Sequence, residues 1–322
     1  MGIVEPIAPG GLFPRHDAPA TLSVAALDRL PRVESNHPSF GERFGAARPP
    51  GMEQLQSQLD AGFALLFADA AAAEAFLGGR VHPAPLGNVS KCKPDGTRKH
   101  RVIQDLRANR VNDAVTLGER QVLPRGVDHA KDVAQLLDTL EAGEVIATLV
   151  LDFKDAFNSV PLHESEQRFN CASLDDPLVR DRPPCYDDEP RSGRFLVWRV
   201  LGFGGKPNPL VYSRAASFAC RSAQALLGPQ RHRSPDDFTN RLALARSQLY
   251  VDDTSLAVAG EERKIGATID LYVLWLLLLG VPIAWAKGEL TFGSTPHRWI
   301  GIEFEATGGG VLMMLPPSLW SS

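Results

Sequence analysis

The stretch Leu249–Val258 reads LYVDDTSLAV and sets two adjacent aspartates, Asp252 and Asp253, between two apolar runs. The apolar residues on both sides predict two short strands over 247–259, joined by a turn at the aspartates. Two neighbouring carboxylates repel each other, and their burial is costly without a positive partner. The pattern therefore predicts either a hairpin that holds a cation or, for a lone pair of aspartates, a plain turn.

A second acidic residue ends the most apolar segment of the chain. Residues 145–153 read VIATLVLDF, an almost continuous apolar run that predicts a strand buried on both faces, and Asp152 lies where the run stops. If this strand lies beside the hairpin, Asp152, Asp252 and Asp253 converge at one edge. Three such carboxylates suit hard divalent cations, which take oxygen ligands. Phe153, the residue after Asp152, has no side-chain atom that could bind a metal. Two ions about 4 Å apart can activate a hydroxyl and stabilise a leaving pyrophosphate.

Five sequence blocks, taken in order, resemble motifs of reverse transcriptases. They are RVIQDLR (101–107), DFKDAFNSVPLH (152–163), LGFGGKPNP (201–209), the YVDD hairpin (250–253), and Lys287 with WIGIE (299–303). Each block by itself is a weak signal, but their order and spacing from Val89 to Phe304 make a strong one. The departures are Gly202, where the family usually has Pro, and Asn208, where Ser is expected. Phe203 is similar to retrotransposon enzymes that read LPFG and favours a gypsy-like or DIRS-like element.

The resemblance implies an α+β fold with the fingers and palm of a right-hand polymerase. The palm sheet is expected to be ferredoxin-like with helices on one face, and the thumb is expected to be largely absent. The expected segments are an extended or poorly ordered lead-in (1–50), fingers (51–125), palm (126–163), a fingers insertion (164–200), palm (201–306) and a C-terminal tail (307–322). Within these we expect helical structure over 52–77, a hairpin over 87–104, and one strand over 298–305.

The resemblance also implies the roles of the site residues. Asp152 and Asp252 would be the main ligands of two Mg²⁺ ions, or of Mn²⁺, with Asp253 in support, and Lys287 would protonate the pyrophosphate. The residues expected to bind the nucleotide are Lys91, Lys93, Arg101, Asp155, Phe157, Phe203 and Gly204. Trp299 and Gly301 would belong to the primer grip. Gly204 is expected to let the backbone approach the nucleotide or template closely, because it has no side chain.

Phe157 separates two classes of polymerase within this resemblance. Five residues after the first aspartate, viral RNA polymerases resemble one another in having a polar residue that can bond the 2′-hydroxyl of a ribonucleotide. Reverse transcriptases have Phe or Tyr there, and the ring of Phe157 would collide with that hydroxyl. The expected substrates are therefore dNTPs. The alternative is that Phe157 belongs to the core.

Composition bounds the remaining interpretations. The net charge is −4, but nine Lys or Arg stand against four acidic residues between Lys91 and Arg125, which indicates a phosphate-binding surface or a solvated basic face. The four cysteines form no CxxC pair, so an intracellular location, cytoplasmic or nuclear, is expected. Residues 265–286 predict a buried helix and a short strand, not a membrane span, because Asp270, Gly280 and Pro282 interrupt the apolar run.

These observations leave two functions of different classes. The first is RNA-directed DNA synthesis on an RNA or DNA template with a primer, and a second chain could supply a thumb. The second is a catalytically inactive, retroelement-derived domain that binds nucleic acid without extending primers. The intact aspartates favour the first, and the short C-terminal part and acidic overall balance favour the second.

Overall fold

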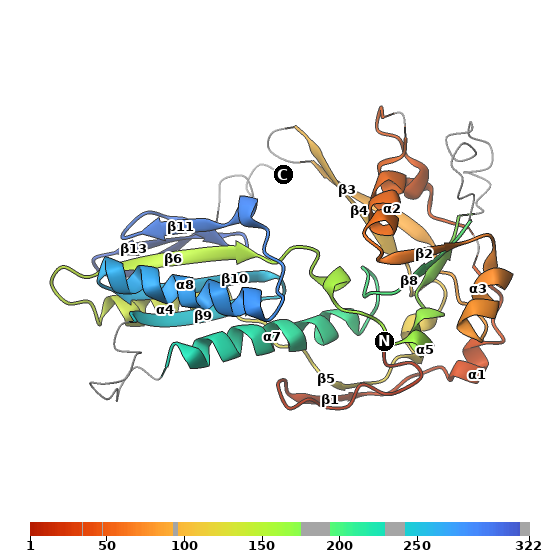
Figure 1. The fold of residues 1–322 in the computed structure, drawn as a ribbon, viewed down its shortest axis with the longest axis horizontal. Coiled ribbons are helices and arrows are strands. Elements are labelled where there is room, and N and C mark those ends of the chain that lie inside the picture. Colours follow the sequence, from red (N-terminus) through yellow and green to blue (C-terminus); the bar gives the residue numbers. More distant parts are fainter. Residues whose placement is uncertain (34, 47, 93–95, 175–193, 229–241, 316–322) are drawn as a thin grey trace. The chain divides into compact units, whose positions relative to one another are not determined.

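The computed structural model describes residues 1–322 except 34, 47, 93–95, 175–193, 229–241 and 316–322. The chain divides into two compact units (Figure 1). Unit 1 consists of Met1–Gln121 and Phe157–Val211, and unit 2 of Val122–Ala156 and Tyr212–Ser322. The two units differ from the expected segments at both ends of the chain. The first 50 residues belong to unit 1, and the last strand belongs to unit 2.

The central sheet of unit 2 has four antiparallel strands in the order β11-β6-β10-β9. Their bounds are β6 (Val145–Asp152), β9 (Leu244–Tyr250), β10 (Asp253–Gly260) and β11 (Glu289–Phe292). The apolar run of β6 is buried on both faces, as its composition predicts. In register, Asp253 lies opposite Asp152 and Gly260 opposite Val145, so β6 and β10 pair along their whole length.

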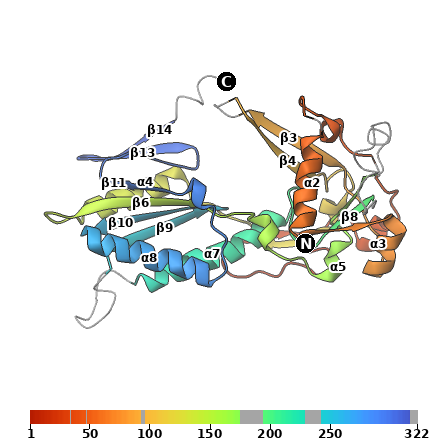
Figure 2. The same cartoon turned by 45° about the horizontal axis from the view of Figure 1, so that its top comes forward.

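Helices cover both faces of this sheet, which corrects the expectation of helices on one face. Helix α4 (Gly126–Leu137) packs on the face that carries Ile146 and Ala257. Helix α8 (Glu262–Leu278) lies on the opposite face, where its Tyr272 hydroxyl contacts the Thr254 hydroxyl at 2.8 Å, and α7 (Asn208–Leu226) packs beside it through the Trp275 Nε1 to Ser222 Oγ hydrogen bond (Figure 2). A sheet whose strands are apolar on both faces is buried by elements packed on each face.

A three-stranded meander follows the central sheet. It consists of β12 (His297–Trp299), β13 (Ile302–Thr307) and β14 (Gly310–Met314). The single strand expected over 298–305 is therefore a hairpin, and part of the expected tail is a strand. The cause is a two-residue turn in which Ile300 (φ 48°) and Gly301 (φ 79°) both adopt the left-handed conformation that a tight hairpin turn requires.

Unit 1 contains a small sheet in the order β2-β8-β7 and a separate hairpin. The bounds are β2 (Ala64–Phe67), β7 (Cys171–Ser173), β8 (Phe195–Trp198), β3 (Leu86–Cys92) and β4 (Arg98–Gln104). The helical segment expected over 52–77 is α2 (Pro50–Asp60) and α3 (Ala70–Leu77), with β2 between them. Residues 64–67 form a strand because they pair along β8, a tertiary contact that local apolar spacing does not reveal.

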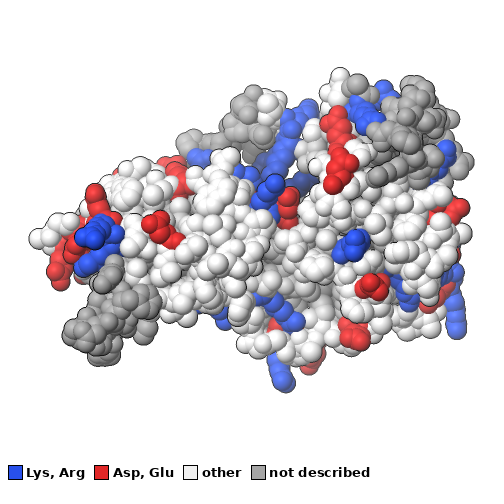
Figure 3. Space-filling view, viewed as in Figure 1, with Lys and Arg blue, Asp and Glu red and all other residues white. Residues whose placement is uncertain are grey.

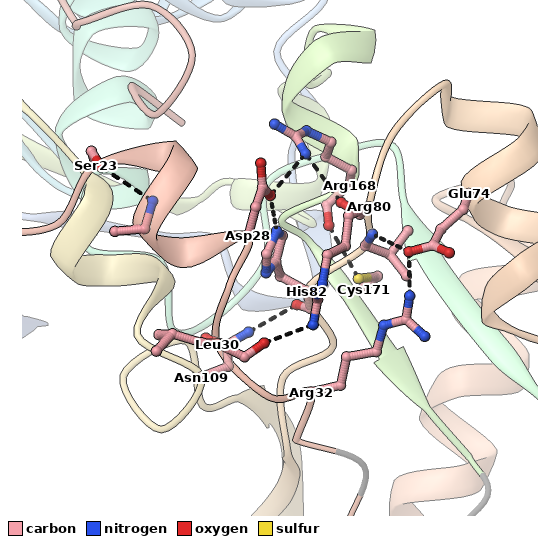
Figure 4. A network of polar contacts seen from close by, with 12 residues as sticks. Ser23, Asp28, Leu30, Arg32, Glu74, Arg80, His82, Asn109, Arg168 and Cys171 are labelled. Carbon is pink, nitrogen blue, oxygen red and sulfur yellow. Dashed lines mark hydrogen bonds and ion pairs between the residues drawn. The ribbon is translucent and has the colours of Figure 1, made fainter.

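The first 50 residues pack onto unit 1, contrary to the poorly ordered lead-in that their composition suggests. They contain β1 (Arg15–Ala18), α1 (Val24–Leu27) and the 3₁₀ turn η1 (Pro38–Gly41), and β1 pairs with β5 (Leu117–Glu119). Buried Leu27 and Phe40 anchor the segment. A polar network adds to this: Asp28 Oδ1 lies 2.8 Å from His82 Nε2 and 3.3 Å from Arg168 Nη1 (Figure 4).

The remaining elements are short. They are η2 (Val111–Ala114), η3 (Phe157–Ser159), α5 (Glu164–Gln167) and η5 (Trp285–Lys287). Among the described residues, no helix combines the length and the apolar character needed to cross a membrane. Residues 175–193 of the expected fingers insertion lie outside the described residues.

Candidate active site in unit 2

The site begins with two carboxylates that face each other across the central sheet. Strand β6 ends at Asp152, strand β10 begins at Asp253, and the two residues are direct partners in the antiparallel ladder. Side chains of directly opposite residues leave a sheet on the same face. The register therefore places both carboxylates on the face that α4 covers.

The hairpin turn differs by one residue from the expected one. Tyr250 pairs with Asp253, so the turn consists of Val251 and Asp252, and Asp253 already belongs to β10. Val251 has φ 57°, an unusual conformation for a β-branched residue. The Asp252 carbonyl accepts a hydrogen bond from the Phe153 amide at 2.9 Å, which ties the turn to the end of β6.

The charges of the three aspartates act together on one buried phenol, Tyr212. Tyr212 is 4% exposed, and burial raises the pKa of its hydroxyl well above the ordinary value. The negative charges of Asp252, Asp152 and Asp253 raise this pKa further. Within the described residues, however, no group of three or more His, Cys, Asp or Glu side chains is arranged to hold a metal ion. The sequence thus predicts that the three aspartates lie near one another. Their side chains do not form a set of metal ligands in this structure.

A lysine provides a positive partner for Asp152, the carboxylate at the end of β6. Lys287 ends the 3₁₀ turn η5, and its Nζ donates to Asp152 Oδ1 at 2.7 Å. The loop before it is fixed to the same residue, because the Ala284 amide donates to the Asp152 carbonyl at 2.8 Å. Lys287 thus lies beside Asp152, and its expected role toward the pyrophosphate stays a prediction.

A cleft of about 510 Å³ opens above these residues. Its lining includes Asp152, Tyr250, Asp253, Lys287, Arg298, Trp299, Ile300 and Gly301. Trp299 Nε1 donates to the Asp253 carbonyl at 3.3 Å, so the turn of the β12–β13 hairpin is attached to the acidic hairpin. The two expected primer-grip residues therefore line the cleft that holds the carboxylates. Sequence reasoning missed Tyr250 and Arg298, although both lie within or beside the quoted motifs.

Two buried histidines hold the β12–β13 hairpin against α4. His129 of α4 and His297 of β12 meet with their Nε2 atoms 2.8 Å apart. The His129 ring also packs on Trp299 and Phe304, with centroid distances of 5.1 and 4.8 Å. Burial lowers the pKa of His129 to about 3, helped by the neighbouring His297, and burial lowers the pKa of His297 to about 4. Both imidazoles are therefore neutral at pH 7.

In unit 1, Phe203 contacts two other expected nucleotide-binding residues, Arg101 and Phe157. The Arg101 guanidinium lies 5.3 Å from the centroid of the Phe203 ring, and Phe203 meets the Phe157 ring edge to face at 5.2 Å. Arg101 lies opposite Val89 and Lys91 opposite Lys99, so these basic side chains share one face of the β3–β4 hairpin, along which blue side chains gather in Figure 3. Lys93 lies outside the described residues.

The other two expected nucleotide-binding residues have different surroundings. Asp155 belongs to unit 2, adopts φ 51° and lies 4.0 Å from the Lys154 ammonium. At Gly204 the close backbone approach is to the protein itself. Its φ is 124°, and an added Cβ would lie 1.8 Å from the Gln104 carbonyl oxygen. The neighbouring Phe203 carbonyl accepts a hydrogen bond from the Gln104 amide at 2.9 Å.

The family comparison agrees with the order of the motifs. Residues 92–304 match the family model described as reverse transcriptase (RNA-dependent DNA polymerase). The chain belongs to this family. Among solved structures, this reverse transcriptase domain is similar to a foamy viral protease–reverse transcriptase in complex with double-stranded DNA, with a TM-score of 0.54 and 19% identity. The match covers 94% of this chain but only 40% of that one. No curated protein matches the sequence.

Proposed function

We propose that the chain carries out template-directed DNA synthesis, transferring a nucleotide from a dNTP to a primer 3′-hydroxyl on an RNA or DNA template. The observation that carries this proposal is the register pair of Asp152 and Asp253 beside Asp252, in the cleft of a reverse transcriptase family member. Phosphoryl transfer depends mainly on positioning and on neutralising charge. Carboxylates at one sheet edge could hold the cations that neutralise this charge, and the Lys287 ammonium adds a further positive charge beside them.

The donor set fits hard divalent cations, because it consists of carboxylate oxygens. We expect Asp152 and Asp252 to hold two Mg²⁺ ions, with Asp253 in support and Mn²⁺ as a substitute. When bound, such ions activate the attacking hydroxyl and stabilise the leaving oxygen. The Lys287 ammonium, which donates to Asp152, is the group we expect to give the leaving pyrophosphate a proton.

Unit 2 would then serve as the palm and unit 1 as the fingers. Lys91, Lys93 and Arg101 would bind the triphosphate as charged hydrogen-bond donors. Phe157, held by Phe203, would exclude the 2′-hydroxyl and select dNTPs. The gypsy-like or DIRS-like origin, an intracellular location and a second chain that supplies a thumb are further parts of this proposal.

The inactive binding domain is the second candidate, and one observation favours it. Lys287 occupies an oxygen of Asp152, and the described residues contain no three-ligand cluster. In that case the same cleft would bind a primer–template without extending it.

Primer extension on an RNA template with Mg²⁺ and dNTPs tests the proposal. The test variant is Asp252→Asn with Asp253→Asn, and the matched control is Asp270→Asn, an exposed carboxylate on α8 of the same unit. Extension by the wild type and the control, but not by the test variant, is the expected result. Tight binding of the primer–template by a folded wild type that never extends it would establish the second candidate instead.

A further inference from the structure

The loop that carries Phe203 is held by hydrogen bonds to its backbone carbonyls. The Phe203 carbonyl accepts from the Gln104 amide of β4 at 2.9 Å. The next carbonyl, that of Gly204, accepts from a side chain, because Asn112 Nδ2 donates to it at 3.0 Å. Asn112 belongs to the 3₁₀ turn η2, so the loop has a support that lies 92 residues earlier in the chain.

Asn112 contacts this loop through both ends of its side-chain amide. Nδ2 donates to the Gly204 carbonyl, and Oδ1 accepts from the Lys206 amide at 2.8 Å. A carboxamide carries a donor and an acceptor side by side, so one side chain makes both contacts at once. The amide therefore bridges the turn at 204–206 and fixes it on both sides of Gly205.

The turn that carries Asn112 is itself fixed to the rest of unit 1. The Asn112 backbone amide donates to the Leu106 carbonyl at 2.9 Å. The neighbouring Asp113 carbonyl accepts from the amides of Thr21 and Leu22, in the lead-in, at 2.8 and 3.1 Å. The Asn112 side chain thus reaches the loop from an ordered support, which is what holds a functional group in a precise place.

Gly204 is the residue of this loop that most needs an outside contact. Its φ is 124°, and glycine has more backbone freedom to lose than any other residue. The residue before it is Phe203, whose ring meets the Phe157 ring at 5.2 Å and lies 5.3 Å from the Arg101 guanidinium. A turn that moves at Gly204 would therefore let the Phe203 ring move as well.

We propose that Asn112 is a positioning residue for the selection of the nucleotide. By fixing the turn at 204–206 it sets the place of the Phe203 ring, and Phe203 in turn holds the Phe157 ring against the 2′-hydroxyl. The inference rests on the proposed function, which gives Phe157 the role of the gate. Asn112 acts through the loop and not on the nucleotide. Sequence reasoning gives it no role, because it lies beyond the RVIQDLR block.

The first test follows the contact itself by amide hydrogen exchange with single-residue resolution, without nucleotide or metal. Asn112→Ala removes both contacts, so the Lys206 amide should exchange several-fold faster than in the wild type. Asn112→Asp keeps an acceptor for this amide but has no donor for the Gly204 carbonyl, so exchange at Lys206 should stay close to the wild-type rate. Wild-type exchange at Lys206 in Asn112→Ala would overturn the proposal.

The matched control is Asn36→Ala. Asn36 has the same arrangement elsewhere in unit 1, where Nδ2 donates to the Ser173 carbonyl at 2.9 Å and Oδ1 accepts from the Leu86 amide at 2.8 Å. Asn36 is buried, whereas Asn112 is half-buried. Asn36→Ala should therefore lower the unfolding free energy more than Asn112→Ala, because buried partners are left without hydrogen bonds. Exchange at Lys206 should be unchanged in the control.

The second test measures the ratio of kcat/KM for dNTP to that for rNTP in primer extension. The ratio should fall several-fold in Asn112→Ala and in Asn112→Asp, because neither variant can donate to the Gly204 carbonyl. It should keep the wild-type value in Asn36→Ala, which loses more stability, so a general weakening of unit 1 does not explain the change. A wild-type ratio in both Asn112 variants would overturn the proposal.

A double variant tests whether Asn112 acts through Phe203. In a Phe203→Ala background, Asn112→Ala should change the ratio no further, because the ring that it positions is already missing. The same fold-change in both backgrounds would show that Asn112 does not act through that ring, and would overturn the proposal. Circular dichroism of each variant separates a displaced loop from a lost fold.

The proposed synthesis and the role of Asn112 fail in different ways. A wild type that does not extend primers refutes the synthesis, and the selection is then measured as the ratio of Kd for rNTP to that for dNTP on the complex with primer–template and Mg²⁺. A preference for dNTP that falls in Asn112→Ala would leave the role of Asn112 standing. No preference in the wild type, or an equal one in the variant, would refute that role.

Discussion

The Nε2 atoms of His129 and His297 meet at 2.8 Å inside unit 2, where one imidazole donates the hydrogen and the other accepts it. The pair joins α4 to β12 and so holds the hairpin that lines the carboxylate cleft. Burial lowers the pKa of His129 to about 3 and of His297 to about 4. The two neutral rings therefore make the unit sensitive to acid.

This pair predicts a loss of stability below neutral pH. The ordinary histidine pKa is 6.5, so the unfolded chain takes up protons as the pH falls through that value while the folded pair does not. The stabilising contribution is present above pH 6.5 and declines toward pH 4 and below. At pH 5 the loss is about 2 kcal/mol for each histidine.

Urea unfolding at pH 7.5 and pH 5 measures this loss. The double variant His129→Leu, His297→Phe should show a smaller decrease in unfolding free energy between the two pH values than the wild type. His16→Gln, which alters an exposed histidine, is the control and should decrease like the wild type. Equal decreases in unfolding free energy in all three proteins would show that His129 and His297 do not cause the sensitivity to acid.

Removing the charge of Lys287 should tighten metal binding. Its ammonium lies 2.7 Å from an oxygen that we expect to hold a divalent cation, and it repels that cation while occupying its ligand. Lys287→Met should lower the Kd for Mn²⁺, measured by electron paramagnetic resonance, several-fold, and should slow primer extension at saturating metal.

The control for this prediction is Lys264→Met, which removes a lysine of α8 from its ion pair of 2.9 Å with Glu261, the residue before the helix. Its Kd for Mn²⁺ should equal that of the wild type. An unchanged Kd in Lys287→Met would show that Asp152 is not a ligand of the metal.

Gly204→Ala should strongly destabilise unit 1. The new Cβ would lie 1.8 Å from the Gln104 carbonyl oxygen, and φ is 124°, so the strands and loop must separate to admit it. We expect a loss of more than about 3 kcal/mol in unfolding free energy. Gly202→Ala is the matched control, because its Cβ would meet only the Gln104 side chain at 3.2 Å and φ is not left-handed. Comparable urea midpoints for the two variants would disprove the clash.

Phe203→Ala should reduce discrimination against ribonucleotides. Phe203 contacts the Phe157 ring at 5.2 Å and the Arg101 guanidinium at 5.3 Å, so its removal leaves the proposed gate less fixed. The ratio of kcat/KM for dNTP to that for rNTP should fall in Phe203→Ala, and fall further in Phe157→Ala. Phe76→Ala, which alters a phenylalanine that is 64% exposed, should keep the wild-type ratio. An unchanged ratio in Phe157→Ala would show that the Phe157 ring serves only the packing of the core and does not select the nucleotide.

Several elements of the fold can be predicted because their signals are local. The apolar run over 145–153 predicts β6, and the quoted hairpin predicts β9 and β10 to within a few residues. The strand at 64–67 is not predictable in this way, since it lies between two helices and forms by pairing with β8. The buried lead-in is missed for the same reason, because Phe40 lies in one core cluster with Leu86 and Trp198, which are far away in the chain.

The sequence by itself determined the family, three of the four strands of the central sheet (β6, β9 and β10) and the three aspartates at its edge, because each depends on residue type and short-range spacing. Tertiary structure decided which partners those residues have. It placed Lys287 on Asp152, a pair 135 residues apart, brought His129 to His297 across 168 residues, and turned Arg298 into the cleft. Such contacts depend on how strands register and how helices cover a sheet, and no local pattern specifies either.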